Sequence, residues 1–460
     1  MRHTWLVLFF ALLLGAGAPT STAKDAPDLQ TRVDALAKHF LDAGIVVGMT
    51  IGVLQDGERH VFGYGRLGAE DETVPDGKTV YEIGSITKVF TGILLADLVR
   101  DGTVKLEQPV QELLPEDVTV PTKGEQPITL RHLATQTSGL PRMPSNFEPA
   151  DPKNPYADYD ATRLYAGLQA AELQSVPGTR YAYSNLGVGL LGHVLGLAAG
   201  KPYETLLRER VLDPLGMSSS AITYTEPMKA RRAPGHLADG TPTSGWDLDA
   251  FAGAGALRST VDDMLDFLAA NLKGGEAPLA TSLASALELH AEPAGQPVKM
   301  GLGWHFGTSP GGRWHNGETG GYHSHAGLLL ENDAAIVILA NTATGKVDQL
   351  AQLLYGLLLG QAVKPPTFDK PVEIDPKVLD EYLGRFALAP TFVLTVTRDG
   401  DQLMVQATGQ ENFPVFPLGD DKFFYKVVEA KLHFTRDDGG KVIGVVLHQG
   451  GREMPATRLD

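Results

Sequence analysis

Ser85 and Lys88 are the first residues whose types and spacing suggest chemistry. They lie in the stretch YEIGSITKVF, and a spacing of three residues places both side chains on one face of a helical turn. A serine hydroxyl becomes a nucleophile when a base takes its proton, and a lysine can be that base if burial or a helix dipole lowers its pKa. Because Ser21 and Lys24 have the same spacing, the pair alone leaves a catalytic and an incidental role equally open.

Tyr183 and Asn185 form a second candidate pair, in the tripeptide Tyr183-Ser184-Asn185 before an apolar stretch of helical periodicity. The Tyr183 phenol could relay a proton, and the Asn185 amide could hold the amide of a substrate. The same tripeptide is typical of a helix start, where Ser184 or Asn185 caps the helix and Tyr183 packs beneath it. Taken alone, the tripeptide favours the helix-capping role over a role in catalysis or substrate binding.

The stretch WHNGETGGYHSH, residues 314–325, combines three histidines, an acid and three glycines. His323 and His325 alternate on a predicted strand and so share a face, and with His315 or His305 they could bind zinc. The alternative is a glycine-rich strand that lies against a substrate. Because the pattern supplies no clear third ligand, the sequence favours the strand and predicts no metal and no other cofactor.

Composition excludes several classes of function. The 460-residue chain has a formal net charge of −16, which disfavours nucleic acid and anionic membrane surfaces as partners. It contains no cysteine, so cysteine nucleophiles, cysteine zinc sites and iron–sulfur clusters are excluded. Ser, His, Tyr, Lys and carboxylates remain for any chemistry.

Residues 1–23 have the pattern of a secretory signal peptide. Arg2 gives a basic start, an apolar run covers 5–14, and small residues lead to Ala23. The apolar run is short of the roughly 20 residues that a spanning helix needs. We therefore predict cleavage after Ala23 and export to the periplasm or the medium, without stable insertion in a membrane.

The chain after the signal peptide predicts two domains. Strand patterns occur near both ends of residues 24–362, and helical periodicity dominates 85–290. This order predicts an α/β domain, in which one antiparallel sheet with flanking helices carries an inserted helical subdomain. The segments concerned are a helix at 29–41, two strands at 45–68 joined at Asp56-Gly57, the later strands GLGWHF, YHSHAGLLLE and AAIVILAN, and a helix at 347–359.

Residues 363–376 are rich in proline and predict a linker. Short alternating segments separated by Asp-Gly and Gly-Gly turns follow over 377–460. This pattern predicts a small all-β barrel.

Taken in order, the motifs resemble those of a known family. Ser85-x-x-Lys88, then Tyr183-x-Asn185 about a hundred residues on, then His315-Asn316-Gly317 on a late strand are similar to the three motifs of penicillin-recognising serine hydrolases, in the class C β-lactamase branch. The stretches LRHLATQTSGLP and ERVLDPLGM strengthen the likeness, which covers roughly 30–360. The barrel resembles the lipocalin-like domain that some members carry.

The resemblance implies a role for each motif. Ser85 would attack a carbonyl to form an acyl-enzyme, and Lys88 and Tyr183 would share the proton transfers. Asn185 would contact the substrate amide. The backbone N–H groups of Ser85 and Glu318 would form an oxyanion hole.

The third motif departs from the family pattern. Class C β-lactamases have Lys-Thr-Gly where this chain has His315-Asn316-Gly317. A histidine of ordinary pKa is mostly neutral at pH 7, so recognition of a substrate carboxylate should be weaker, and Asn316 lacks the threonine hydroxyl. We still place His315, Asn316 and Gly317 among the substrate-binding residues.

We therefore predict a serine hydrolase that cleaves an amide bond of the β-lactam or D-amino-acid peptide type in a small molecule or peptide. The alternatives are a carboxylesterase of the same family and a penicillin-binding sensor that does not turn over. The sequence leaves the oligomeric state unassigned.

Overall fold

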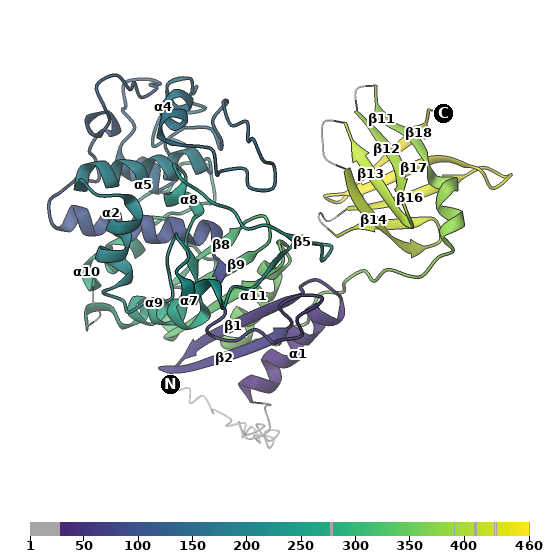
Figure 1. Ribbon diagram of the computed structural model, residues 1–460, viewed down its shortest axis with the longest axis horizontal. Coiled ribbons are helices and arrows are strands. Elements are labelled where there is room, and N and C mark those ends of the chain that lie inside the picture. The colour runs from purple at the N-terminus through teal and green to yellow at the C-terminus, as the bar shows by residue number, and fades with distance from the viewer. Residues whose placement is uncertain are drawn as a thin grey trace, which may run out of the picture.

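The computed structural model contains an α/β domain and a separate β-barrel (Figure 1). It describes residues 28–276, 279–390, 392–408, 412–426, 428 and 430–459. The predicted signal peptide, residues 1–23, lies outside this set. Over the described ranges, no helix combines the length and the apolar character that crossing a membrane requires.

A six-stranded antiparallel sheet forms the centre of the α/β domain, in the order β2-β1-β10-β9-β8-β7. Strands β1 and β10, which are neighbours in this order, join the two ends of the domain, with Thr50 of β1 opposite Leu339 of β10. The sheet therefore forms from both ends of the segment, as the sequence predicts. The strands are β1 (Gly48–Gln55), β2 (Glu58–Gly65), β7 (His305–Phe306), β8 (Gly312–Glu318), β9 (His323–Leu329) and β10 (Ala334–Ala340).

The predicted strand GLGWHF is wrong over its first four residues. Only His305–Phe306 pairs with β8. Gly303 has a φ of +80°, and a Cβ there would come within 2.5 Å of the Lys88 carbonyl oxygen. Close packing against the backbone of Lys88 thus replaces extended pairing in this segment.

Helices cover both faces of the sheet (Figure 1). Helices α1 (Leu29–Asp42) and α11 (Val347–Leu358) pack on one face, in a core that includes Phe40, Ile338 and Leu354. Helix α9 (Val261–Lys273) packs on the other face. Because both faces are covered, β10 is buried along its whole length.

The helical subdomain is built around α2 (Thr87–Arg100), whose residues 87–98 are all buried. Two short two-stranded sheets accompany it, β3 (Tyr81–Glu82) with β6 (Arg258–Ser259) and β4 (Gly235–His236) with β5 (Pro242–Thr243). The other helices are α3 (Leu130–Ala134), α4 (Ala161–Gln169), α5 (Asn185–Ala199), α6 (Tyr203–Leu207), α7 (Glu226–Lys229), α8 (Ala252–Gly255) and α10 (Ala280–Leu287).

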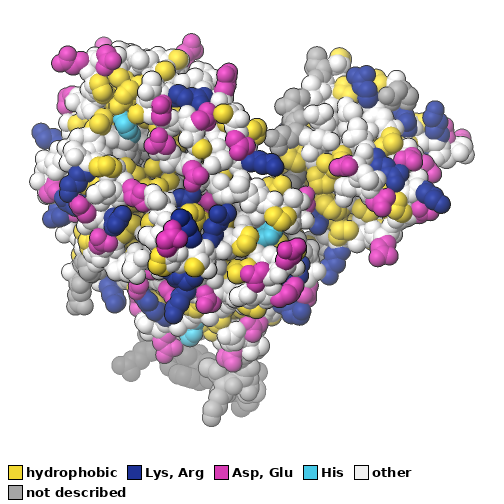
Figure 2. Space-filling model, in the orientation of Figure 1, with side chains coloured by type: hydrophobic (Ala, Val, Ile, Leu, Met, Phe, Trp, Pro, Cys, Tyr) yellow, Lys and Arg dark blue, Asp and Glu magenta, His cyan; other side chains and the backbone are white. Residues whose placement is uncertain are grey.

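The C-terminal region is a closed eight-stranded barrel with its own core, which includes Phe386, Phe423 and Phe434. Residues 361–375 precede it without helix or strand. Figure 2 shows a notch between the barrel and the larger domain, and acidic and basic side chains intermixed over the visible face of both. The strands are β11 (Gly384–Ala389), β12 (Phe392–Asp399), β13 (Gln402–Ala407), β14 (Asn412–Gly419), β15 (Lys422–Tyr425), β16 (Ala430–Arg436), β17 (Val442–Gln449) and β18 (Arg452–Arg458).

Candidate active site

A pocket of about 380 Å³ lies between the helical subdomain and the end of β8. Six of the eight site residues expected from the sequence line it, and Lys88 and His315 are buried beside it. The lining residues are Ser85, Arg142, Tyr156, Tyr183, Asn185, Trp246, Leu248, Phe251, Ala254, Gly255, Asn316, Gly317, Glu318, Thr319 and His323.

Ser85 and Lys88 meet as their spacing predicts. Ser85 lies in a single 3-10 turn that leads into α2, and Lys88 lies in the first turn of that helix. Lys88 Nζ is 2.9 Å from Ser85 Oγ and donates to the carbonyl oxygen of Ala254 at 2.6 Å. The amine is therefore in place to exchange a proton with the hydroxyl.

Burial lowers the pKa of Lys88 well below that of a lysine in water, and the positive charge of Arg142 lowers it further. The side chain is only 1% exposed. No carboxylate in the described part of the chain hydrogen bonds to Lys88 or forms an ion pair with it. A neutral amine, the form that can accept a proton, is therefore favoured.

Tyr183 is positioned by the start of α5. Ser184 Oγ accepts from the N–H of Gly187 at 2.8 Å, so Ser184 caps the helix and the flanking Tyr183 faces the pocket. Lys88 Nζ lies 4.9 Å from the centroid of the Tyr183 ring. Burial raises the pKa of Tyr183, so the phenol keeps its proton at neutral pH. The tripeptide therefore does both things considered above: Ser184 caps the helix, and Tyr183 faces the pocket.

Two glycines bring β8 against the turn that carries Ser85. Gly84 has a φ of +50°, and a Cβ on it would come within 2.7 Å of the Glu318 nitrogen. A Cβ on Gly317 would come within 2.0 Å of the Ile83 carbonyl oxygen and 2.8 Å of the Ser85 nitrogen. Side chains at these positions would push the two backbones apart. The glycines therefore keep the N–H groups of Ser85 and Glu318 on the same pocket.

A chain of ion pairs joins the end of β8 to β9 and α11. His323 Nδ1 is 2.9 Å from Glu318 Oε2, and its Nε2 is 3.2 Å from Asp348 Oδ2. Asn316 donates to the same Asp348 oxygen at 2.7 Å. Burial alone would lower the pKa of His323, but hydrogen bonds to Asp348 and Glu318 raise it to about 9. His323 is therefore a cation held between two carboxylates at neutral pH.

His315 is buried beside the pocket, with its ring near those of His305 and Tyr183. Its ring centroid is 5.0 Å from that of His305 and 6.3 Å from that of Tyr183. Burial lowers the pKa of His315 well below its ordinary value, and the charges of His305 and Lys88 lower it further. His315 is thus neutral, as the sequence implies, but it is a packing neighbour of Tyr183 and does not line the pocket.

The histidines considered for zinc have other partners. His325 Nδ1 is 2.7 Å from Asp348 Oδ1, and its Nε2 is 3.0 Å from the Tyr355 hydroxyl. His305 Nε2 lies 3.0 Å from the Tyr181 hydroxyl. Nowhere in the described ranges do three His, Asp or Glu side chains form a group suited to a metal ion.

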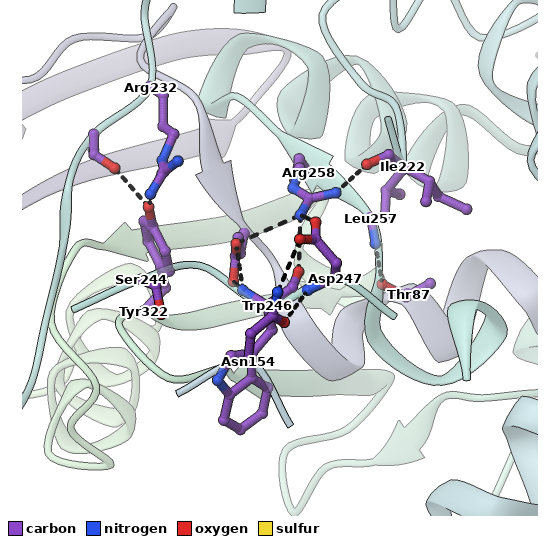
Figure 3. Close-up of polar contacts among 12 residues, drawn as sticks. Thr87, Asn154, Ile222, Arg232, Ser244, Trp246, Asp247, Leu257, Arg258 and Tyr322 are labelled. Atoms are coloured by element: carbon purple, nitrogen blue, oxygen red, sulfur yellow. Dashed lines mark hydrogen bonds and ion pairs between the residues drawn. The ribbon is translucent and has the colours of Figure 1, made fainter. Parts of the chain in front are cut away.

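Sequence reasoning missed Trp246, which lines the pocket from the loop before α8. Figure 3 shows how this loop is anchored: Arg258 donates to the Trp246 carbonyl oxygen at 2.8 Å and to Asp247 at 2.9 Å. The buried Glu82, three residues before Ser85, accepts from the Trp246 N–H at 3.1 Å. A tryptophan between Ser244-Gly245 and Asp247, one of only four in the chain, was the available signal.

Arg142 was missed as well. It directly follows the stretch LRHLATQTSGLP and lines the pocket beside Asn185. Its position immediately after a stretch typical of the family was the signal that could have identified it.

The chain also contains one match to the Gly-x-Ser-x-Gly motif of α/β-hydrolases, at Gly307–Gly311. In those enzymes the serine lies between a strand and a helix. Here the segment is a turn between the antiparallel strands β7 and β8, and Ser309 is absent from the pocket lining. The match is therefore incidental.

Comparison with known proteins gives two family matches. The profile of the family described as Beta-lactamase matches residues 33–360. The profile of a domain of unknown function, DUF3471, matches residues 369–458, which contain the barrel.

Individual relatives agree with the first match. The chain is 30% identical over 358 residues to the D-alanyl-D-alanine-carboxypeptidase/endopeptidase AmpH of Escherichia coli (strain K12), covering 73% of this chain and 91% of that protein. It is 24% identical over 464 residues to penicillin-binding protein 4* of Bacillus subtilis (strain 168), covering 94% and 98%. A crystal structure of a β-lactamase/D-alanine carboxypeptidase from Yersinia pestis, complexed with citrate, has a TM-score of 0.64 and 28% identity, covering 72% of this chain and 98% of that one.

Proposed function

The chain belongs to the β-lactamase family of serine hydrolases, and from that premise we propose that it cleaves its substrate through an acyl-enzyme on Ser85. The observation that carries the proposal is the buried Lys88 amine, which lies 2.9 Å from Ser85 Oγ without a carboxylate to hold its proton. Such an amine supplies the base that a serine nucleophile needs.

In the proposed reaction, Ser85 Oγ attacks the substrate carbonyl while Lys88 accepts the hydroxyl proton. The carbonyl oxygen, now negative, is stabilised by the N–H groups of Ser85 and Glu318. Tyr183 passes a proton to the leaving nitrogen or oxygen and recovers one from the Lys88 ammonium. Water then attacks the ester carbonyl, and its proton returns through the same groups to Ser85 Oγ, which releases the acid.

We propose an amide of the D-amino-acid peptide or β-lactam type as substrate. Asn185 Oδ1 is buried and has no hydrogen-bond partner in the described structure, and Asn185 lines the pocket. A buried acceptor without a partner is costly, and the N–H of a substrate amide would satisfy it. The carboxypeptidase relative supports a peptide before a β-lactam.

A carboxylesterase is the second candidate, and His315 favours it. Because this side chain is neutral and buried, the position where class C β-lactamases have a lysine supplies no cation for a substrate carboxylate. An ester with a neutral leaving group needs no such cation.

The test compares kcat/KM for nitrocefin, a D-Ala-D-Ala peptide and p-nitrophenyl esters, in the wild type and in Ser85→Ala. We expect the peptide to be the best substrate and Ser85→Ala to be inactive on all three. Mass spectrometry after incubation with a penicillin should show an adduct on Ser85 that is absent from the variant. Substantial turnover by Ser85→Ala would refute the mechanism, and a stable adduct without any turnover would identify a sensor.

We also propose that residues 24–362 form the hydrolase domain, 363–376 the linker and 377–460 the barrel, and that the protein is exported to the periplasm or the medium. N-terminal sequencing of exported protein tests the proposed cleavage after Ala23. A mature chain that begins elsewhere would change the first boundary.

A further inference from the structure

Arg142 presents an unpaired guanidinium group to the pocket. Its backbone is fixed, because its carbonyl oxygen accepts from the N–H groups of Asn185 at 3.0 Å and Leu186 at 3.2 Å. Its side chain is exposed and has no hydrogen bond or ion pair to any residue that the structure describes. The guanidinium carbon lies 5.1 Å from the centroid of the Tyr183 ring. A positive charge is therefore held beside the reacting groups without a counter-charge.

The other charged groups of the pocket do not neutralise Arg142. Glu318 is the only acid in the pocket lining, and its carboxylate contacts His323 at 2.9 Å. Arg142 is the only arginine or lysine in that lining. The chain has 55 acidic residues against 39 Lys and Arg, so acidic partners for an exposed arginine are plentiful. The absence of one at this position leaves the guanidinium available to a ligand.

Arg142 shares its wall of the pocket with Asn185, which supplies the orphaned acceptor Oδ1. Resting on the proposed function, in which Asn185 contacts a substrate amide, we propose that this wall holds the acyl side of the scissile bond and that Arg142 binds a carboxylate carried by the acyl part of the substrate. The enzyme then prefers peptides and esters whose acyl group is acidic. A guanidinium suits this role because its planar donors match the two oxygens of a carboxylate.

A purely electrostatic role for Arg142 makes a different prediction. After burial, the charge of Arg142 is a further factor that lowers the pKa of Lys88. A change in that effect alters the reactivity of Ser85 towards every substrate. Recognition of a substrate carboxylate instead alters the ratio between acidic and neutral substrates, so this ratio is the quantity to measure.

The experiment measures kcat/KM for p-nitrophenyl hydrogen glutarate and p-nitrophenyl butyrate, which share a leaving group. Peptides X-D-Ala-D-Ala with X as Glu or Gln provide the amide pair. In Arg142→Gln we expect the acidic-to-neutral ratio to fall about tenfold, the loss of roughly one charge-assisted contact. Arg142→Lys should retain part of the ratio, and salt should weaken the wild-type preference. Arg208→Gln, which removes an exposed arginine outside the pocket, is the matched control.

An unchanged ratio in Arg142→Gln would overturn the proposal, even if both rates fell together. A second pair, phenyl acetate and its 4-carboxyphenyl analogue, carries the charge on the leaving group. If Arg142→Gln lowered the acidic-to-neutral ratio of kcat/KM for this pair alone, the acyl-side assignment would also be overturned. The proposed function fails separately, through activity that survives in Ser85→Ala, whereas the Arg142 ratio is read only from Ser85-dependent turnover.

Discussion

Lys88 is buried beside the pocket and His323 lines it, and their pKa values are shifted in opposite directions. Both are nearly inaccessible, at 1% and 3% exposure. Among the described residues, Lys88 has only Ser85 and a backbone carbonyl as hydrogen-bond partners, and its pKa falls. His323 lies between Glu318 and Asp348, and its pKa rises to about 9.

The difference shows that burial alone does not decide the charge of a base in this site. Desolvation disfavours the cation in both cases, and only a carboxylate within hydrogen-bonding distance reverses the effect. In the part of the chain that the structure describes, no carboxylate pairs with Lys88, so that a proton can leave and return. Strand β8 supplies one acid, Glu318, to His323, and helix α11 supplies the other, Asp348, so that the charge stays and holds β8 in place.

Replacing Lys88 is the most severe test of the comparison. Lys88→Met removes the base while keeping a long apolar stem, so we expect acylation to slow by about 10³-fold or more and Tm to stay the same or rise. Lys88→Arg keeps a charge that cannot be released, so it should be equally inactive and should also lower Tm. Stopped-flow acylation and thermal melts measure both effects. Rapid acylation by either variant would exclude Lys88 as the base.

Placing a carboxylate beside Lys88 should raise its pKa, as Glu318 and Asp348 do for His323. Ala254 lines the pocket, and its carbonyl oxygen contacts the amine, so Ala254→Asp would place a carboxylate nearby. The pKa of Lys88 should rise, and the acidic limb of the kcat/KM profile should move up by about one pH unit or more. Activity at pH 7 should then fall about tenfold. Ala254→Asn, of equal size, is the control, and identical profiles for the two variants would contradict the interpretation.

Removing one of the two carboxylate partners of His323 should lower the stability of the fold more than the catalytic rate. Asp348→Asn leaves the buried imidazolium with one carboxylate, and we expect a loss of about 3 kcal/mol in the free energy of unfolding. The pKa of His323 is raised, so the stabilisation is complete below its ordinary value of 6.5 and is lost as the pH rises through about 9. Urea titrations at pH 6 and pH 9.5 measure this difference, with Glu70→Gln, an exposed acid, as the control. If Asp348→Asn lost the same free energy of unfolding at both pH values, an ion pair between His323 and Asp348 would be contradicted.

The smallest effect is expected for Glu318→Gln. The proposed contribution of this residue is its backbone N–H, and its side chain is 56% exposed. The amide can still contact His323, so kcat/KM should change by less than about threefold. Kinetics on the preferred substrate measure it. A loss of a hundredfold would mean that the carboxylate itself takes part in the reaction.

The sequence predicts the parts of the site that depend on local spacing. Ser85 and Lys88 meet because three residues make one helical turn, and Tyr183 and Asn185 flank a helix cap. The two-domain order and the pairing of the terminal strands also follow from periodicity, since strand and helix patterns differ along the chain.

The remaining contacts join elements that are distant in the sequence. Asp348 reaches His323, on strand β9, from helix α11, and Trp246 and Arg142 reach the pocket from loops without a periodic pattern. The inward orientation of His315 depends on the register of β8, in which it pairs with Ala326, and no local spacing sets that register. The apolar pattern of GLGWHF was overridden by the contact between Gly303 and the Lys88 backbone.

The pairing of β1 with β10 also fixes when the central sheet can be completed during synthesis. Thr50 has no sheet partner on that side until Leu339 has been made, and contacts between such distant segments form late in folding. Until then the emerging chain carries an N-terminal hairpin that is not joined to β9 and β8. The sheet that links β8 to the N-terminal hairpin is therefore completed only after β10 has been made, and a product that stops before β10 lacks this link.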